Sequence, residues 1–486
     1  MPIDNQHALY AQFYDQWYKC RLIAEGEDTV KAADNYDESE QVFLPIPEGM
    51  TRNEYNSYKK RATFYNATGR TIEVLKGLIF RKEPRKEVPE SVNYFLGSVT
   101  ATGESIDSFA RQIIDEMLTT TRGAVLVDFP QTDIMDESGN VIQRTLAQAE
   151  SLKEQPYFSF YNAESIINWK TTIRNNESVL EWVILREYQD IQEPDDEYKY
   201  NEVEVFRKLY IDGMGHYFQE VWGKNEAGEF VIIEGPIMPL MNGKPLDYIP
   251  FIYFNGLNMN ISEIHKPMLL DLVNVNISHY RTSADLEHAL HFTALPTAVI
   301  TGIRNDKKEN QTFFIGSAAA WLLPKDANAF FLEFQGHGIE PSREVISDKE
   351  QQMSKLGARL LAVDKKAVEA AQTAEINRAG ESASLADRAI LVSMVITEAL
   401  KIALEWMGVK DAISYLLNTD FMPLAISPET LNSLMKSWQA GGMSFETLYF
   451  NMQRGELTRP GISAEDEKTL IDMEMPEPPM PGEDNE

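Results

Sequence analysis

Residues Pro341 to Gly408 read PSREVISDKEQQMSKLGARLLAVDKKAVEAAQTAEINRAGESASLADRAILVSMVITEALKIALEWMG. This pattern predicts a helix, a short loop and a second, much longer helix. In the first arm, Ser342 to Leu361, the apolar residues recur at steps that keep them on one helical face. They are Ile346, Met353, Leu356 and Leu360.

The second arm, from Thr373 to Met407, is predicted as a helix of roughly 50 Å at about 1.5 Å per residue. Its apolar stripe is expected at Ala379, Ala383, Ala386, Ile390, Met394, Leu400, Leu404 and Met407. A helix of this length usually supports an assembly. The loop between the arms, Ala362 to Gln372, carries Lys365 and Lys366, which would project into whatever space lies opposite.

Length and composition set the class of protein. A chain of 486 residues exceeds the usual single-domain size, so two to four structural units are expected. The sequence has no run of about 18 apolar residues and its start lacks the pattern of a signal peptide, so we expect a soluble, cytosolic protein. The one cysteine, Cys20, excludes an intrachain disulfide framework and is expected to be a small buried apolar group.

Charge argues against tight nucleic-acid binding. The chain has 75 acidic and 45 basic residues, for a net charge of -30, which is the wrong sign for gripping phosphates. The same acidity suits a surface past which DNA slides with little attraction. Solubility alone is the simpler explanation.

The chain divides by pattern into segments. Residues up to about 150 are expected to be mainly helical, with one buried strand at Gly123 to Pro130, and residues 156–255 to form an antiparallel sheet. A long helix from Pro267 to Leu295 and a strand-rich insertion precede the Pro341 hairpin. After Gly408, helices are expected at 411–418, 428–439 and 444–454, and the acidic, proline-containing end beyond Glu465 is expected to be disordered.

Motifs for catalysis are weak. Asp285, His288 and His291 are candidate metal ligands. However, the zinc-protease spacing is absent, and histidines that pack between helices are the favoured interpretation. The sequence contains no Walker loop, no GxGxxG after a strand and no GxSxG elbow. Asp128, at the end of the buried strand, is a candidate carboxylate without an identifiable partner.

Basic residues form three groups. Arg81, Lys82, Arg85 and Lys86 follow a helix and are expected to complement its negative C-terminal end. Arg304, Lys307 and Lys308 lie on a predicted exposed turn and would meet a phosphate backbone or an acidic protein. Lys365 and Lys366 differ because they stand on a loop between two long helices.

The chain resembles the portal proteins of tailed double-stranded DNA bacteriophages, in a branch long catalogued as a domain of unknown function. The resemblance rests on short words in a fixed order over nearly the whole chain. They are Arg61-Ala62, Arg70-Thr71, 77–82 (GLIFRK), Val127-Asp128, 166–169 (IINW), 249–251 (IPF), 283–288 (SADLEH), Pro296-Thr297, Ile315-Gly316, 353–361 (MSKLGARLL), Glu405-Trp406 and 418–421 (NTDF). A turn with two prolines that many portals carry after the second stem helix is absent here.

The resemblance implies an α+β portal fold: a wing, a helical stem, a small αβ clip, a long kinked wing helix and a helical C-terminal crown. The implied boundaries are 1–263 for the wing, 264–296 for the first stem helix, 297–340 for the clip, 341–361 for the second stem helix, 362–372 for the tunnel loop, 373–408 for the long wing helix, 409–464 for the crown and 465–486 for a disordered acidic tail. The weak helix formers around Gly380 and Ser382 suit the kink.

The resemblance also implies a function without enzymatic activity or cofactors. It implies a ring of about twelve subunits at one capsid vertex, assembled in the host cytoplasm and carried in the virion. Through it double-stranded DNA would be packaged, retained and ejected, with Lys365 and Lys366 facing the DNA. Arg304, Lys307 and Lys308 in the clip would contact the terminase packaging motor or the tail adaptor proteins. The major capsid protein would be a further partner, and a membrane would not.

Two other functions remain open from the residues. One is a cytosolic metal-dependent hydrolase that uses the histidine-rich helix. The other is an acidic minor capsid or scaffold protein without a channel. At -30 per chain, a ring of about twelve copies would carry roughly -360, so its wall would be largely repulsive to DNA.

Overall fold

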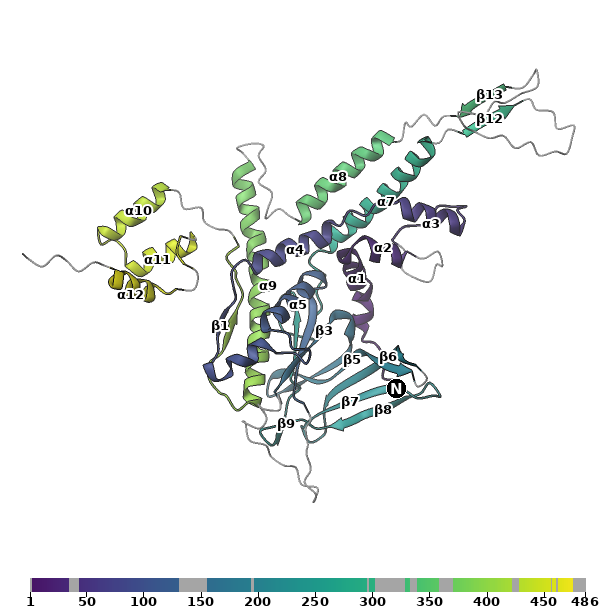
Figure 1. Cartoon of the computed structure of the whole chain (residues 1–486). Helices are drawn as coiled ribbons and strands as arrows, with labels where there is room; N and C mark the ends of the chain where they lie inside the picture. The colour runs from purple at the N-terminus through teal and green to yellow at the C-terminus, as the bar shows by residue number, and fades with distance from the viewer. Residues whose placement is uncertain are drawn as a thin grey trace, which may run out of the picture. The chain divides into compact units, whose positions relative to one another are not determined.

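The fold, seen in a computed structural model, is a mixture of helices and antiparallel sheets (Figure 1). The structure describes residues 2–34, 43–130, 155–193, 196–294, 297–301, 328–332, 339–357, 370–421, 428–455, 457–459 and 462–474. The chain divides into two compact units, Met1–Thr419 and Asp420–Glu486.

Helices form most of the N-terminal segment, as predicted. They are α1 (Ala8–Glu25), α2 (Glu27–Ala33), α3 (Arg52–Arg61), α4 (Ala67–Ile79), the 3-10 helix η1 (Glu90–Gly97) and α5 (Ile106–Thr119). Local side chains fix several starts: Thr51 and Glu54 form a capping box on α3, and the hydroxyl of Ser105 accepts the Ser108 N–H at the start of α5. These boundaries are therefore largely encoded in the local sequence.

A three-stranded antiparallel sheet lies at the centre of the first unit. Its strand order is β11-β2-β3, from β2 (Arg122–Asp128), β3 (Tyr157–Asn162) and β11 (Phe251–Asn255). Val125 is paired with Phe160 on one side and with Ile252 on the other. All seven residues of β2 are buried, which confirms the predicted buried strand.

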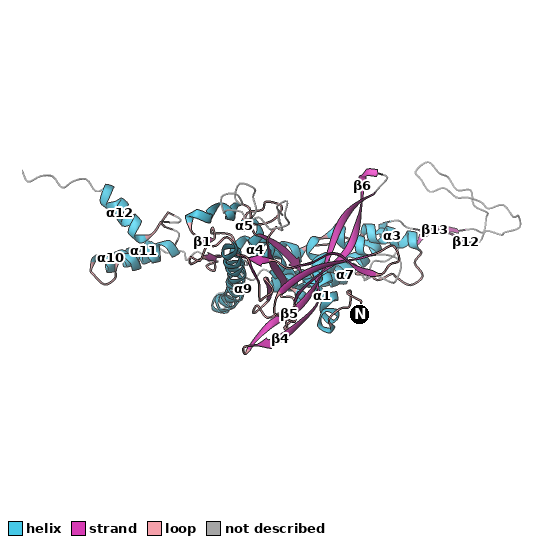
Figure 2. Ribbon diagram, turned by 90° about the horizontal axis from the view of Figure 1, so that it is seen from below, coloured by secondary structure: helices cyan, strands magenta, loops and turns pink. Residues whose placement is uncertain are grey.

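The second sheet has five antiparallel strands in the order β4-β5-β6-β7-β8. Figure 2 labels β4, β5 and β6 of this sheet. Its strands are β4 (Ile166–Arg174), β5 (Glu177–Glu193), β6 (Asp196–Ile211), β7 (Tyr217–Lys224) and β8 (Phe230–Ile237), and η2 (Ala163–Ser165) precedes it. Asn175 and Asn176, which join β4 to β5, both have positive φ, as a tight hairpin turn requires. The antiparallel strands predicted for residues 156–255 are present, but the prediction of one sheet is wrong: β4 to β8 form this sheet, β3 and β11 pair with β2, and Leu240–Met241 and Lys244–Pro245 form a separate pair.

Two small strand pairs complete the first unit outside the 297–332 segment. One is β9 (Leu240–Met241) with β10 (Lys244–Pro245), and the other is β1 (Arg85–Glu87) with β14 (Ser414–Leu416). The helix predicted at 411–418 is wrong because this segment pairs with a strand more than 300 residues away. Tyr415 is fully buried there and its hydroxyl donates to Asp107 Oδ1 at 2.9 Å.

The same strand pair corrects the role predicted for two basic residues. Helix α4 ends at Ile79, and Arg85 and Lys86 lie in β1 rather than at the helix terminus. Lys86 pairs with Asp107 and Arg85 with Glu87. Their positive charges therefore act on neighbouring carboxylates, and not on the dipole of α4.

The helical hairpin of the sequence is present with shifted ends. Helix α7 (Leu270–Ala294) confirms the helix predicted from Pro267 to Leu295, and α8 (Ile339–Gly357) and α9 (Ala370–Trp406) occupy the two predicted arms. Between α7 and α8 in the chain, β12 (Thr297–Thr301) and β13 (Asn328–Leu332) pair in antiparallel fashion. The predicted loop at 362–372 lies outside the described residues except for its last three, which belong to α9.

The apolar stripe predicted on α9 is partly wrong. Ile390 is 48% exposed and Met394 is 54% exposed, whereas Leu400 and Leu404 are buried as expected. The error arises because α9 contacts elements on several sides, namely α5, β2, β11 and β14. Burial around this helix therefore covers more than one face, and the single gap falls on the side of Ile390 and Met394.

The second unit contains α10 (Pro428–Gln439), α11 (Phe445–Arg454) and α12 (Ala464–Glu474). Helix α12 corrects the prediction of disorder beyond Glu465 for residues up to 474. Ser463 caps it by accepting the Asp466 N–H at 3.1 Å, and three acidic residues occupy its first turn, where they suit the positive end of the helix dipole. Residues 475–486 lie outside the described part of the chain.

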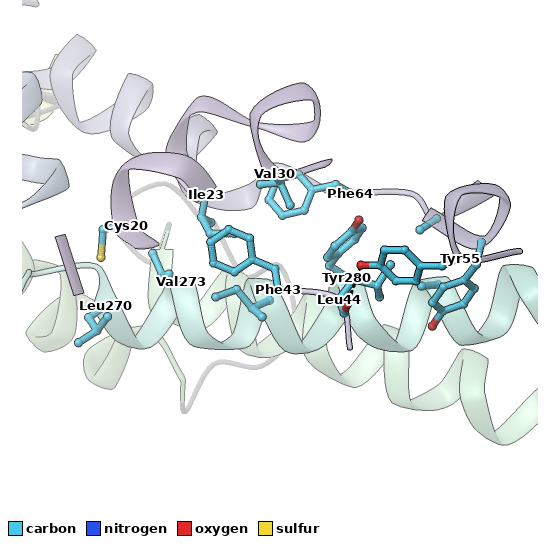
Figure 3. Close-up of a cluster of buried hydrophobic side chains, with 14 residues drawn as sticks. Cys20, Ile23, Val30, Phe43, Leu44, Tyr55, Phe64, Leu270, Val273 and Tyr280 are labelled. Carbon is cyan, nitrogen blue, oxygen red and sulfur yellow. Dashed lines mark hydrogen bonds between the residues drawn. The ribbon is translucent and has the colours of Figure 1, made fainter. Parts of the chain in front are cut away.

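One apolar cluster joins α7 to the N-terminal helices (Figure 3). Val273 and Tyr280 point from α7 toward side chains of α1, α2 and the segment before α3. The cluster comprises Cys20, Ile23, Val30, Phe43, Leu44, Tyr55, Tyr58, Ala62, Phe64, Leu270, Val273, Ile277, Tyr280 and Ala284. Cys20 is buried among them as expected, and burial raises the pKa of its thiol to about 12.

Truncating one cluster residue on α7 tests how much this contact stabilises the unit. Ile277→Ala is expected to lower the free energy of unfolding by about 2–4 kcal/mol, because it removes buried methyl groups and leaves a cavity. Chemical denaturation measures the change. Val231→Ala on the exposed strand β8 serves as the control and should change stability by less than about 0.5 kcal/mol. Equal effects of the two variants would contradict the assignment.

Candidate functional site

The candidate site is the antiparallel pair formed by α7 and α8 with the residues that hold it. Asn276, fully buried on α7, ties this helix to the start of α4. Its Oδ1 accepts from the backbone N–H of Thr68 at 3.2 Å and from the Thr68 hydroxyl at 3.1 Å, and its Nδ2 donates to the Tyr65 carbonyl at 2.8 Å. These bonds fix the rotation of α7 about its own axis.

A buried carboxylate makes the next contact along α7. Asp34 Oδ1 accepts the backbone N–H groups of Phe43 at 2.6 Å and Leu44 at 2.9 Å, and its Oδ2 accepts from the Tyr280 hydroxyl at 3.3 Å. Burial raises the pKa of Asp34 although these hydrogen bonds oppose the rise. The carboxylate therefore holds Phe43 and Leu44 next to Tyr280 of α7.

Helix α8 packs on α7 through a narrow stripe. Met353 is buried, and Lys349 turns inward to donate to the Ser278 carbonyl at 3.0 Å and to the Thr282 hydroxyl. Gly357 lies so close to α4 that an added Cβ would stand 2.5 Å from Thr71 Oγ1, so no larger residue fits without movement. The predicted stripe is confirmed at Met353 and wrong at Leu356, which is 47% exposed.

A histidine lies in the seam between the two helices. His279 is buried, and within the described chain neither ring nitrogen has a hydrogen-bond partner. Its Nε2 is 3.6 Å from Glu350 Oε1 on α8. Burial lowers the pKa of His279, the Glu350 carboxylate opposes this, and Lys349 adds to the lowering. The ring is therefore held in its neutral form.

The residues proposed above for a metal hydrolase have protein partners. Asp285 Oδ1 accepts from the Tyr58 hydroxyl at 2.6 Å, and His288 Nδ1 lies 3.2 Å from Arg61 Nη2. His288 and His291 line one cavity. Over the ranges that the structure describes, no three His, Cys, Asp or Glu side chains are placed to hold a metal ion together.

Asp128 has hydrogen-bond partners that could not be identified from the sequence. Its carboxylate accepts from the Phe129 N–H at 2.9 Å and the Tyr157 hydroxyl at 3.3 Å, and Gln219 Nε2 lies 3.4 Å away. Burial raises its pKa, with Arg207 among the opposing influences. Asp128 therefore connects β2 of the three-stranded sheet to β7 of the five-stranded sheet. This structural role depends on the contact between the two sheets.

The outward side of α8 is predominantly acidic. Its exposed acids outnumber its exposed bases, and Lys349 is turned into the seam. The exposed acids are Glu340, Glu344, Asp348 and Glu350, of which Glu350 borders the His279 seam, and the exposed bases are Arg343 and Lys355. A phosphate backbone near this face would meet net repulsion.

Most of the site residues predicted from the sequence are not located. Lys365 and Lys366 of the loop and Arg304, Lys307 and Lys308 of the clip lie outside the described residues. Gly380 and Ser382 lie within α9, which continues as one helix from Ala370 to Trp406. The kink at these residues stays a prediction.

One family model matches part of the chain. Described as "Domain of unknown function (DUF4055)", it covers residues 268–407. This range begins two residues before α7 and ends one residue after α9, so it contains α7, β12, β13, α8 and α9. No curated protein matches the chain.

Several solved structures are similar to this chain at low identity. One is titled "Virion of native gene transfer agent (GTA) particle" (12% identity, 86% of this chain and 97% of that chain, TM-score 0.38). A second is titled "Neck of native GTA particle computed with C12 symmetry" (11%, 78% and 86%, TM-score 0.35). A third is titled "Neck of empty GTA particle computed with C6 symmetry" (10%, 88% and 96%, TM-score 0.37). Because these TM-scores are below 0.5, we infer nothing further from them.

Among the helices placed by the structure, none combines the length and the apolar composition that a membrane span needs.

The His279 seam predicts a pH dependence of stability. Because the folded-state pKa of His279 lies below 6.5, unfolding takes up a proton at mildly acidic pH. Stability is therefore full above pH 6.5 and falls as the pH drops from there through the folded pKa. In His279→Phe, denaturant titrations between pH 7.5 and 5.5 should give a shallower fall than in the wild type.

A second variant tests the same seam in the opposite direction. Glu350→Gln removes the carboxylate that raises the pKa of His279, so the stability should fall more steeply on acidification than in the wild type. Wild-type slopes in both variants would show that another group controls the acid response.

Proposed function

We propose that this protein is a bacteriophage portal protein, a ring of about twelve subunits that forms the DNA channel at one capsid vertex. The observation that carries the proposal is the order of elements from α7 to α9: a long helix, a paired-strand insertion, a second helix packed on the first and then a 37-residue helix. This order agrees with the stem, clip, stem and wing-helix order that the sequence resemblance implies. The family model spans the same elements.

The electrostatics support a conduit rather than a DNA-gripping protein. Nonspecific DNA affinity comes mostly from Lys and Arg contacts with phosphates, and this chain has a net charge of -30. In the proposed ring, the acidic outward side of α8 would line the channel and hold DNA away from the wall. One pair of lysines per subunit, Lys365 and Lys366, would then give about two dozen positive groups that guide the phosphates.

The remaining assignments follow from the same proposal. The protein has no catalytic activity or cofactor of its own and resides in the virion after assembly in the host cytoplasm. The clip residues Arg304, Lys307 and Lys308 contact the packaging motor during filling and the tail adaptor afterwards. The wing borders the major capsid protein.

Imaging of the purified chain tests the proposal directly. Negative-stain class averages should show rings with a central hole. Monomers or solid particles at assembly concentrations would favour an acidic minor capsid or scaffold protein. Metal retained in stoichiometric amount by the purified protein, together with loss of that metal on His288→Ala, would instead revive the hydrolase.

The lysine pair predicts a defect in DNA handling. Particles that carry Lys365→Ala together with Lys366→Ala should package or retain less DNA than wild type, because the ring would lose its positive guide. Quantitative measurement of packaged DNA, with and without nuclease, checks this. Lys401→Ala is the matched control because Lys401 is an exposed lysine on α9 that pairs with Glu398. Equal DNA content in both variants would count against the guiding role.

A further inference from the structure

A cavity of about 470 Å³ lies where the N-terminal segment meets the last turns of α7. Its walls come from two parts of the chain that are far apart in sequence. The lining residues are Glu48, Gly49, Met50, Asn53, Glu54, Ser57, Arg61, His288 and His291. Two histidines and an arginine thus converge on one space, and the portal role proposed above does not use them.

Arg61 is the central group of this cavity. Its Nη2 is 3.2 Å from His288 Nδ1, and because a guanidinium only donates, Nδ1 is the acceptor and the ring carries its proton on Nε2. Arg61 Nε is buried and has no hydrogen-bond acceptor in the described part of the chain. A buried donor without an acceptor is costly, so part of the hydrogen-bonding capacity of Arg61 is unmet among the described residues.

Among the described residues, no neighbouring carboxylate forms an ion pair with Arg61, although Glu48 and Glu54 also line the cavity. Glu54 Oε2 accepts from the backbone N–H and the hydroxyl of Thr51, each at 2.8 Å, and these bonds hold it at the start of α3. Asp285 accepts from Tyr58 at 2.6 Å. Glu48, the remaining acid of the lining, is exposed to solvent.

Burial and two neighbouring basic groups act together on the pKa of His288. Burial lowers the pKa of His288 first, and the charges of Arg61 and His291 lower it further, while Asp285 alone opposes them. An anion placed between these groups would remove their mutual repulsion and would favour protonated imidazole.

We propose that this cavity is a binding site for a tetrahedral oxyanion, held by Arg61 with His288 and His291. The Asn53 amide on α3 is a further hydrogen-bond donor at the same cavity wall, whereas the Ser57 hydroxyl already donates to the Asn53 carbonyl at 3.0 Å. The ligand chemistry is that of a phosphate group, which free inorganic phosphate and the backbone of a nucleic acid both provide.

Titration calorimetry with sodium sulfate on the full-length protein tests the site. We expect saturable binding that weakens roughly tenfold or more in Arg61→Gln, because a charge-assisted, forked contact is lost. Arg61→Lys should restore part of the affinity. Lys60→Gln is the matched control, an exposed cation one residue away that does not line the cavity, and it should bind as the wild type does. Circular dichroism melting confirms that each variant is folded.

The pH response separates this site from general surface attraction. The titratable groups at the cavity are Glu48, Glu54, Arg61, His288 and His291, with Asp285 and Tyr58 behind it. Sulfate keeps its charge between pH 6 and pH 8, so tighter binding at pH 6 with proton uptake would come from the histidines. In His288→Gln this pH dependence should shrink.

Competition experiments identify the source of the anion. Displacement of sulfate by inorganic phosphate but not by a 20-base-pair duplex assigns the site to a free anion, and displacement by the duplex assigns it to a nucleic-acid backbone. The proposal is overturned if sulfate does not saturate the wild type, or if Arg61→Gln and Lys60→Gln bind alike. Because ring formation is measured by imaging, neither result depends on the portal assignment.

Discussion

Helix α7 is fixed on two sides, and the other parts of the candidate site depend on that constraint. On one side its apolar residues enter a cluster with α1, α2 and the segment before α3, and Asn276 ties it to α4 through three hydrogen bonds. On the other side α8 packs along it through Met353 and the inward-turned Lys349. The contacts with the N-terminal helices thus fix the direction of the α7–α8 pair.

The polar groups between the N-terminal helices and α7 determine the position of α7 more than they add to net stability. A buried carboxylate such as Asp34 is costly to desolvate. The backbone N–H groups of Phe43 and Leu44 offset that cost only when they lie within hydrogen-bonding distance of Asp34. The same reasoning applies to His279, which is kept neutral in the seam. Apolar burial supplies the driving force, and the polar contacts select one arrangement of α7 among the many that burial alone would allow.

Charge is arranged differently inside and outside the α7–α8 pair. Lys349 is turned into the seam and the exposed charges of α8 are mainly acidic, while Arg61, His288 and His291 converge on a small cavity near the end of α7 that Glu48 and Glu54 also line. A protein with a net charge of -30 can therefore repel phosphates along one surface and still present a local site for an oxyanion. The proposed conduit and the proposed anion site use these two regions separately.

The sequence by itself determined the elements whose signals are local: the lengths of α7, α8 and α9, the cap of α5 at Ser105, the buried strand β2 and the antiparallel strands with their asparagine turns. Tertiary structure decided what depends on distant partners. Tyr415 lies in a strand because β1 pairs with it, and Ile390 and Met394 are exposed because α9 is covered from other directions. Arg61 meets His288 across 227 residues, and Asp128 meets Gln219 across 91. Periodicity records which face of a segment is apolar, but it holds no information on which distant segment covers that face.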